Sequence, residues 1–306
     1  MNFFSSIYFL LITPSLLFLI GASSSLYKKA FSRIIAILVL PTYLLGTYRS
    51  AGVDIKAYRR IFENSSQDMF DPGFLLLINF FKFIGIGFEG FLLSMGVITS
   101  FLYLKISKFF NVEYGILMLI LMLHIFLVRD FSQLRVGLAI SIVIFSFTYS
   151  SNLKYIGYLL GISLHLTSIV LISLLIYYEI FLRNRSSFLR IILPILAIVI
   201  IGNTISYLGA FDPRIDLYLS WEREGYGAPV DSFKQPFFII FIVIFHLYFS
   251  RKNIFQIDLF YFTYLAAFTI FFAFSDYSIF SYRLSNVAMS LYPITIAYMY
   301  ENSRPT

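Results

Sequence analysis

Arg135 and His165 are the two residues of this sequence best suited to chemistry, and both lie inside long apolar stretches. An ionised side chain near the centre of a bilayer costs roughly 2.5–3.5 kcal/mol, so it faces protein, water or a ligand rather than lipid. A guanidinium binds anions at any physiological pH, and an imidazole can exchange a proton near neutrality. Together the two residues predict a site that binds an anion and transfers a proton.

The spacing of the two residues predicts that they lie close together. Arg135 is about fifteen residues before the polar turn at 150–152, and His165 is about thirteen after it. With a rise of about 1.5 Å per helical residue, an antiparallel hairpin would bring them to similar heights. Gly157 and Gly161 precede His165 at intervals of four, which predicts one small-residue packing face that also carries the imidazole. The alternative is that His165 only donates a hydrogen bond to a neighbouring helix.

The composition is that of a membrane protein. Hydrophobic residues make up 59% of the 306 residues and charged residues only 13%, and the mean hydropathy is +0.83. Soluble domains average about 25% charged residues. At about 20 residues per crossing there is room for roughly ten crossings. The net charge of +7 is scattered between apolar runs, which favours lipid headgroups or anionic substrates over nucleic acid as partners.

We therefore predict an all-α, polytopic bundle of about 10–11 transmembrane helices in a single integral membrane domain, 1–306. The run at 72–86 is short for a crossing and is expected to be re-entrant or tilted. Two long connections, 49–71 and 209–235, are rich in charged residues, and the distribution of Lys and Arg does not fix the orientation. The apolar runs predict helices at 3–20, 31–48, 72–86, 88–106, 113–128, 131–149, 155–178, 188–208, 236–250, 257–275 and 279–300.

The last of these runs carries a polar stripe. Arg283, Asn286 and Ser290 follow one another at intervals of three and four, so they share one face of a helix. Such a stripe faces the core of a bundle or a water-filled cleft. Arg283 is near the expected helix end, and its side chain could instead extend to the membrane interface.

Two further patterns predict no chemistry. Residues 85–90 match G-x-G-x-x-G, but they join two apolar helices, whereas a dinucleotide site needs a strand before the turn. We interpret them as a tight hairpin. The nearest candidate for a metal site is a group of acids in the 209–235 loop, but a solvated loop explains them better, so we expect no metal and no cofactor. The acids are Asp212, Asp216, Glu222 and Glu224.

Four elements, taken in order, resemble the EpsG family of membrane polysaccharide polymerases, which is related in role to the Wzy O-antigen polymerases. Residues 49–62 are similar to the family's R-x-x-G-x-D-x-x-x-Y-x-x-x-F, and 71–74 read Asp-Pro-Gly-Phe where the family usually has Glu-Pro-Gly-Phe. Residues 133–139 resemble I-R-Q-G-L-A, with the Gln before the Arg, and 164–168 resemble F-H-x-S-A. The resemblance covers about residues 45–178, then Arg283 and, loosely, Tyr292-Pro293.

The resemblance implies a glycosyltransferase-type polymerase in the bacterial inner membrane, with its active site toward the external (periplasmic) face. Its substrates would be oligosaccharide repeat units carried on undecaprenyl diphosphate, joined into O-antigen, capsule or exopolysaccharide. A sugar hydroxyl would attack the anomeric carbon of the other chain, and the lipid diphosphate would leave. The implied fold is similar to the metal-independent GT-C-type glycosyltransferases, and the implied partners are membrane lipid and a chain-length regulator.

Under this resemblance each candidate residue has an expected role. Arg135 and Arg283 would bind the leaving diphosphate, because guanidinium groups pair with phosphate oxygens. His165 would accept the proton of the attacking hydroxyl, and Asp54 would be either the alternative base or the residue that orients a sugar hydroxyl. The remaining candidates would bind substrate: Arg49, Tyr58, Gln133 and Asn286.

Other functions remain open. The closest alternative is another lipid-linked glycan enzyme, such as an O-antigen ligase or a glycosyltransferase, which would differ in its acceptor. A lipid-linked glycan transporter or flippase would show broken helices in repeated halves and intramembrane carboxylates, of which Asp276 is the one arguable example. A purely structural scaffold would leave Arg135 and His165 without a function.

Overall fold

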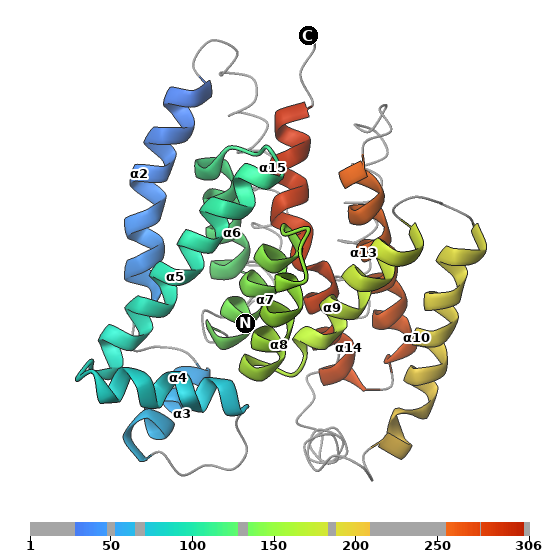
Figure 1. Cartoon of the computed structure of the whole chain (residues 1–306), viewed down its shortest axis with the longest axis horizontal. Helices are drawn as coiled ribbons and strands as arrows, with labels where there is room; N and C mark the ends of the chain where they lie inside the picture. Colours follow the sequence, from blue (N-terminus) through green and yellow to red (C-terminus); the bar gives the residue numbers. More distant parts are fainter. Residues whose placement is uncertain are drawn as a thin grey trace. The chain divides into compact units, whose positions relative to one another are not determined.

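The computed structural model describes residues 28–47, 53–64, 71–127, 134–182, 188–208, 255–275 and 277–302, and every regular element in these ranges is helical (Figure 1). The predicted all-α class is therefore confirmed. The predicted helices at 3–20 and 236–250 lie outside the described residues. The described helices group into two compact units, one of residues up to Ser168 and from Pro293, the other of Ile169–Tyr292. The single domain expected from the sequence stays a prediction.

The first unit contains the segments that carry the candidate motifs. Within it α7 packs on α8 and on α5, α2 packs on α6 and α5, and α4 contacts α8. Its helices are α2 (Lys28–Thr47), α3 (Val53–Asn64), α4 (Pro72–Phe83), α5 (Phe88–Phe109), α6 (Tyr114–Leu127), α7 (Leu134–Phe147), α8 (Leu153–Leu164) and, from its second residue, α15 (Tyr292–Asn302).

The second unit is built around α13, which packs on both α10 and α14. A π-helical turn continues α9, and a 3-10 turn follows α14. The elements are α9 (Ser168–Tyr177), the π turn Tyr178–Leu182, α10 (Phe188–Leu208), α13 (Phe255–Ala273), α14 (Ser278–Ala288) and the 3-10 turn Met289–Leu291.

The connection 49–71, expected to be a loop, contains the helix α3. This helix is amphipathic: Tyr58, Ile61 and Phe62 are buried, whereas Lys56 and Arg60 are exposed. Half of its residues are polar, so a search for continuous apolar runs passes over it. Its helical spacing of apolar residues was the signal that would have revealed it.

The helix predicted at 155–178 is wrong as a single element, because α8 ends at Leu164 and α9 begins at Ser168. His165 is the C-cap of α8 and has an extended backbone, with φ −158° and ψ 115°. The interval of four residues from Gly161 to His165 therefore does not determine the direction of the His165 side chain, because His165 lies beyond the end of the helix. The run at 279–300 is also interrupted, by the 3-10 turn before Tyr292. Pro293 is in the first turn of α15, where a missing N–H is tolerated.

The predicted small-residue packing strip on α8 is confirmed. A Cβ atom added at Gly161 would lie 2.5 Å from Cγ2 of Val143, and one at Gly157 would overlap the side chain of Ser146. Both neighbours belong to α7. A side chain at either glycine would therefore require Val143 or Ser146 to shift, so the two helices approach closely here.

The G-x-G-x-x-G stretch is the predicted tight turn, here between α4 and α5. Gly85 has φ 75°, a left-handed conformation that glycine adopts without a steric penalty. Its N–H donates to Lys82 O (3.0 Å), and the N–H of Ile86 donates to Phe81 O (3.0 Å), the paired bonds of a Schellman cap. This turn sets α4 at a steep angle to α5 (Figure 1).

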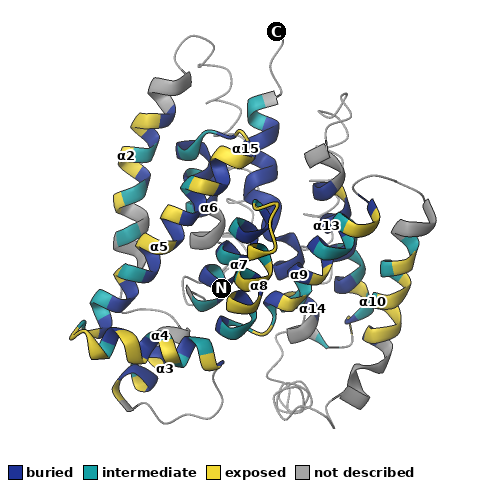
Figure 2. Cartoon of the chain, in the orientation of Figure 1, coloured by how far each residue is buried: buried dark blue, intermediate teal, exposed yellow. Residues whose placement is uncertain are grey.

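Exposed residues recur along α2 and α5 (yellow in Figure 2), and many of them are apolar. Ile37 is 70% exposed and Phe101 is 55% exposed. Within the described ranges, one helix, Phe88–Phe109, is both long and apolar enough to cross a membrane, and several other apolar helices are shorter. The predicted number of crossings and the GT-C likeness stay predictions.

We expect Gly157→Ala to destabilise the protein, because the new methyl group would overlap Ser146. The expected loss is about 1–3 kcal/mol, measured as a lower unfolding midpoint in detergent. The matched control is Gly137→Ala on α7, where a Cβ would meet no atom within 4 Å. Adding Ser146→Gly to Gly157→Ala should restore part of the loss, and equal effects of both alanine variants would contradict the close approach.

The free energy of unfolding should also decrease as the pH rises, because of the carboxyl group of Glu301. Burial, aided by the nearby Glu113 carboxylate, raises the pKa of Glu301 to about 7, above its ordinary value of 4.5. The folded state therefore holds this proton more tightly than the unfolded state, and the contribution present below pH 4.5 is lost as the pH rises through 7. We expect Glu301→Gln to gain stability relative to the unsubstituted protein between pH 5 and pH 8. If the difference in stability between the two proteins were the same at pH 5 and pH 8, this result would contradict the raised pKa of Glu301.

Candidate functional site

The segment Asp71-Pro72-Gly73-Phe74 begins α4 and forms one side of the candidate site. The main-chain carbonyl of Asp71 accepts hydrogen bonds from the N–H groups of Phe74 (3.0 Å) and Leu75 (3.2 Å), which closes the first helical turn. Pro72 follows at the position where its fixed φ suits a helix start. The Asp71 side chain makes no capping hydrogen bond to α4. Its carboxylate is thus available for another partner.

That partner is Arg135, in the first turn of α7. Nη1 of Arg135 lies 3.1 Å from Oδ2 of Asp71, and the two side chains are only 16% and 8% exposed. The guanidinium carbon also lies 5.5 Å from the ring centroid of Phe74. Removing one partner of such a buried pair leaves an uncompensated charge and typically costs about 3–5 kcal/mol. The ion pair therefore fixes Arg135 against α4.

Asp71 was not among the residues predicted for the site, although its motif was recognised. The sequence signal was an acid directly before Pro-Gly-Phe, at the end of a charged connection. Sequence reasoning treated the four residues as part of a motif and gave the acid no partner. In the structure Asp71 pairs with Arg135, so the two partners are 64 positions apart in the sequence, at 71 and 135.

Gly73 brings the same segment against the end of α8. A Cβ atom at Gly73 would lie 2.8 Å from the carbonyl carbon of Ser163 and would overlap the Ser163 hydroxyl. Ser163 is two residues before His165. Arg135 and His165 were predicted to lie at similar heights in an antiparallel hairpin, and α7 does pack on α8. The contact at Gly73 also brings the segment of Asp71 to the end of α8, whereas a direct meeting of Arg135 and His165 stays a prediction. No residue larger than glycine fits at position 73 without movement of the Ser163 backbone.

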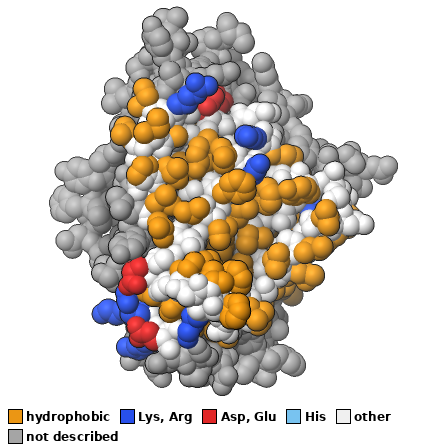
Figure 3. Space-filling view, turned by 60° about the vertical axis from the view of Figure 1, so that its left-hand side comes forward, with side chains coloured by type: hydrophobic (Ala, Val, Ile, Leu, Met, Phe, Trp, Pro, Cys, Tyr) orange, Lys and Arg blue, Asp and Glu red, His pale blue; other side chains and the backbone are white. Residues whose placement is uncertain are grey.

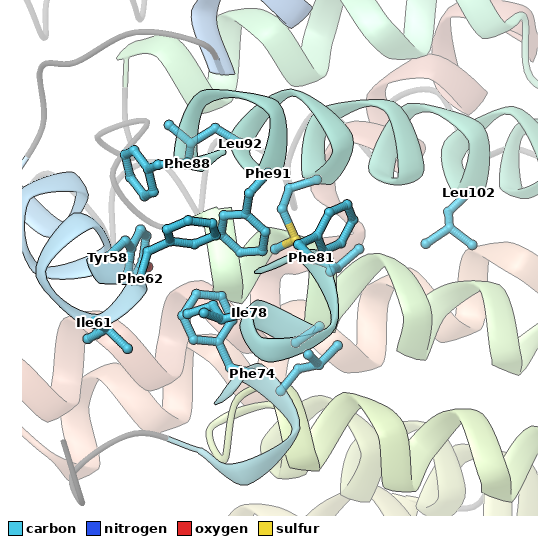
Figure 4. Close-up of a cluster of buried hydrophobic side chains, with 14 residues drawn as sticks. Tyr58, Ile61, Phe62, Phe74, Ile78, Phe81, Phe88, Phe91, Leu92 and Leu102 are labelled. Atoms are coloured by element: carbon cyan, nitrogen blue, oxygen red, sulfur yellow. The ribbon is translucent and has the colours of Figure 1, made fainter. Parts of the chain in front are cut away.

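An aromatic cluster supports the face of Phe74 (Figure 4). Figure 4 shows rings from α3, α4 and α5 packed together; Tyr58 and Phe74 have ring centroids 5.3 Å apart, and Phe74 and Phe91 6.0 Å apart. Tyr58 is only 3% exposed. Its observed role is to support the ring on which Arg135 lies, and its predicted contact with substrate stays a prediction.

His165 is held in the break between α8 and α9. Its main-chain N–H donates to Gly161 O (3.0 Å), and its carbonyl accepts from the N–H of Ser168 (3.0 Å). The ring atom Nδ1 lies 3.2 Å from the backbone N of Thr167, which donates to it, and 3.1 Å from the Thr167 hydroxyl. The imidazole, which is partly exposed, is therefore anchored by the residue two positions further on.

The remaining predicted residues of the first part of the chain have no side-chain geometry to report. Asp54 belongs to the first turn of α3. Arg49 and Gln133 lie outside the described residues, although Gln133 directly precedes α7. Their predicted roles stay predictions.

Arg283 and Asn286 lie in α14 of the second unit. Asn286 is buried and Arg283 is partly exposed, and the Ser290 hydroxyl donates to Asn286 O (3.2 Å). The expected burial of the polar stripe is therefore confirmed at Asn286 and Ser290. A meeting of Arg283 with the Asp71–Arg135 pair stays a prediction.

In chemical terms the site offers a positive group with a fixed position and an imidazole with a fixed ring. The guanidinium is oriented by the Asp71 carboxylate and the Phe74 ring, and a cation that is already oriented needs little reorganisation to bind an anion. Among the described residues, no group of three or more His, Cys, Asp or Glu residues could hold a metal ion. The acids of the 209–235 loop lie outside those residues.

We expect Asp71→Ala to lower stability by about 3 kcal/mol or more, because Arg135 would remain buried without its carboxylate. The control is Asp71→Glu, which keeps the charge and adds one methylene. Thermal unfolding in detergent should place Asp71→Glu close to the unsubstituted protein. The double variant Asp71→Leu/Arg135→Met should recover much of the stability, and additive losses in that variant would contradict the ion pair.

Comparison with known proteins adds one match. No curated protein and no solved structure matches this chain. The family model described as "EpsG family" matches residues 31–305, which include both units, the Asp71–Arg135 pair and the break at His165. This match covers most of the chain and agrees with the order of motifs found in the sequence. The chain belongs to the EpsG family.

Proposed function

We propose that this protein polymerises oligosaccharide repeat units carried on undecaprenyl diphosphate, as a multi-pass enzyme of the bacterial inner membrane. Membership of the EpsG family supports a role in polysaccharide biosynthesis at a membrane and an activity of the polymerase kind. The substrate, the external position of the site and the reaction below are the proposal.

The observation that carries the proposal is the Asp71–Arg135 pair. A buried cation in an apolar chain is costly, and here a carboxylate, an aromatic ring and a close helix contact hold it in place. Such an arrangement fits an anionic ligand that reaches the protein within a lipid environment. A lipid diphosphate has this chemistry, because its phosphates lie at the membrane interface on an apolar tail.

The surface of the first unit agrees with a lipid environment. Figure 3 shows hydrophobic side chains over much of the described part of one face, with charged groups near its top and lower left and a few Lys or Arg side chains in its upper middle. Arg59 of α3 forms an ion pair with Glu89 of α5 (2.7 Å). Exposed apolar residues of α2 and α5 include Ile34, Ile37, Leu38, Val97 and Phe101.

In the proposed reaction, the oxygen of a sugar hydroxyl at the end of one repeat unit attacks the anomeric carbon of the other chain. The new glycosidic C–O bond forms as the C–O bond to the diphosphate breaks, and the lipid diphosphate leaves with the bonding electron pair. Arg135 binds the phosphate oxygens on which negative charge collects, and Arg283 is proposed to assist it. The hydroxyl proton passes to a base, for which the sequence suggests His165 or Asp54.

The proposal is tested in a strain that lacks the gene and is complemented with variants of Arg135. We expect Arg135→Ala to abolish long polymer and to cause single undecaprenyl-linked units to accumulate. Arg135→Lys should retain a small fraction of activity, because it keeps the charge but loses the paired hydrogen bonds. Lipid-linked glycans separated by length provide the measurement.

The matched control is Lys105→Ala, which removes an exposed cation of α5 that lies over the Phe101 ring. It should leave polymer length unchanged. Normal polymer from an expressed, folded Arg135→Ala variant would contradict the proposal. Loss of glycan transfer to lipid A–core, with normal polymer on the lipid carrier, would indicate a ligase instead.

A further inference from the structure

We propose that His165 acts as a hydrogen-bond donor through its Nε2–H group, and that Thr167 is the positioning residue that holds the ring in this tautomer. The inference deepens the proposed function, since its ligand is the phosphate or glycosidic oxygen of the same substrate. It replaces the role of proton acceptor expected for His165 from the sequence.

The tautomer follows from the backbone of Thr167. A main-chain N–H can only donate, and the N–H of Thr167 points at Nδ1 of His165 over 3.2 Å. Nδ1 is therefore the acceptor, and a neutral imidazole then carries its one proton on Nε2. The Thr167 hydroxyl, 3.1 Å from Nδ1, can turn its own hydrogen toward the same lone pair.

The surrounding chain keeps this arrangement rigid. His165 is fixed on both sides by main-chain bonds, to Gly161 O and from the N–H of Ser168, each 3.0 Å long. The extended backbone at His165 ends α8 and lets the ring fold back toward the N–H of Thr167. Side chains that accept a hydrogen bond from a backbone N–H two residues on are a known alternative to helix continuation. The break in the helix and the tautomer thus have the same origin.

A proton acceptor needs an available lone pair, and this geometry assigns the Nδ1 lone pair to Thr167. If Nε2 were to accept the hydroxyl proton, the proton already on the neutral ring would have to be on Nδ1. There it would point at the N–H of Thr167, which is also a donor. The Nε2–H group instead suits an oxygen that gains negative charge, as the departing diphosphate does. The contact between Gly73 and Ser163 brings the segment of His165 to the segment that holds Arg135. The proton of the attacking hydroxyl then passes to the carboxylate of Asp54, the other candidate base.

The tautomer is tested without any activity measurement, by ¹⁵N NMR of the full chain labelled at histidine in lipid nanodiscs. The chain has three histidines, and the signals lost in His165→Gln belong to His165. At a pH where the ring is neutral, we expect a protonated Nε2 and an unprotonated Nδ1. A protonated Nδ1 would overturn the proposal, whatever the reaction of the enzyme proves to be.

The catalytic role is tested with two amide substitutions in the polymerisation assay. The amide nitrogen of Gln reaches the position of Nε2, whereas the shorter Asn reaches only the position of Nδ1. We expect His165→Gln to keep a kcat about tenfold or more above that of His165→Asn and His165→Ala, with little difference in KM. A base role would make all three variants equally inactive, and that result would overturn the proposal.

Two substitutions of Thr167 test its positioning role. Thr167→Ser keeps both donors and should match the unsubstituted protein, whereas Thr167→Val keeps only the backbone N–H and should lower kcat severalfold without a change in the assigned tautomer. An inactive Thr167→Ser variant with a normal unfolding midpoint would overturn the positioning role.

Discussion

The ion pair between Asp71 and Arg135 is the interaction on which the arrangement of the first unit depends. It joins the start of α4 to α7, and the two side chains are only 16% and 8% exposed. Such pairs seldom add net stability compared with apolar residues of the same size, but they penalise any arrangement that separates the partners. The pair therefore specifies where α4 lies, and α4 in turn carries the aromatic ring that borders the guanidinium.

The four residues at the start of α4 illustrate how one short motif meets several physical requirements. Asp71 supplies a main-chain carbonyl to the helix and a carboxylate to Arg135, and Gly73 permits contact with α8. Phe74 is buried between Tyr58 and the guanidinium. Since these contacts involve three other helices, the role of each residue depends on tertiary packing that the local sequence does not contain.

Sequence reasoning was most successful where local physics decides the structure. Long apolar runs predicted most helices, the spacing of Gly157 and Gly161 predicted the close approach of α7 and α8, and the glycines at 85–90 predicted a turn. It failed for the break at His165, which has no proline or glycine to mark it. At that break the His165 ring accepts a hydrogen bond from the N–H of Thr167, which apolar periodicity does not register. Arg135 and His165 were named as candidates from their residue types alone, and their roles stay predictions. The pairing of Asp71 with Arg135 could not be predicted, because it requires knowledge of which helices meet.

The residue before Pro72 is Asp, whose side chain is one methylene shorter than that of Glu. The shorter side chain extends its carboxylate one methylene less from the backbone, so α4 must lie nearer to α7 for the same ion pair to form. The tight contact between Gly73 and Ser163 shows that α4 does lie very close to its neighbours. The start of α4 is therefore held from two sides, by the Asp71 carboxylate against Arg135 of α7 and by Gly73 against Ser163 of α8.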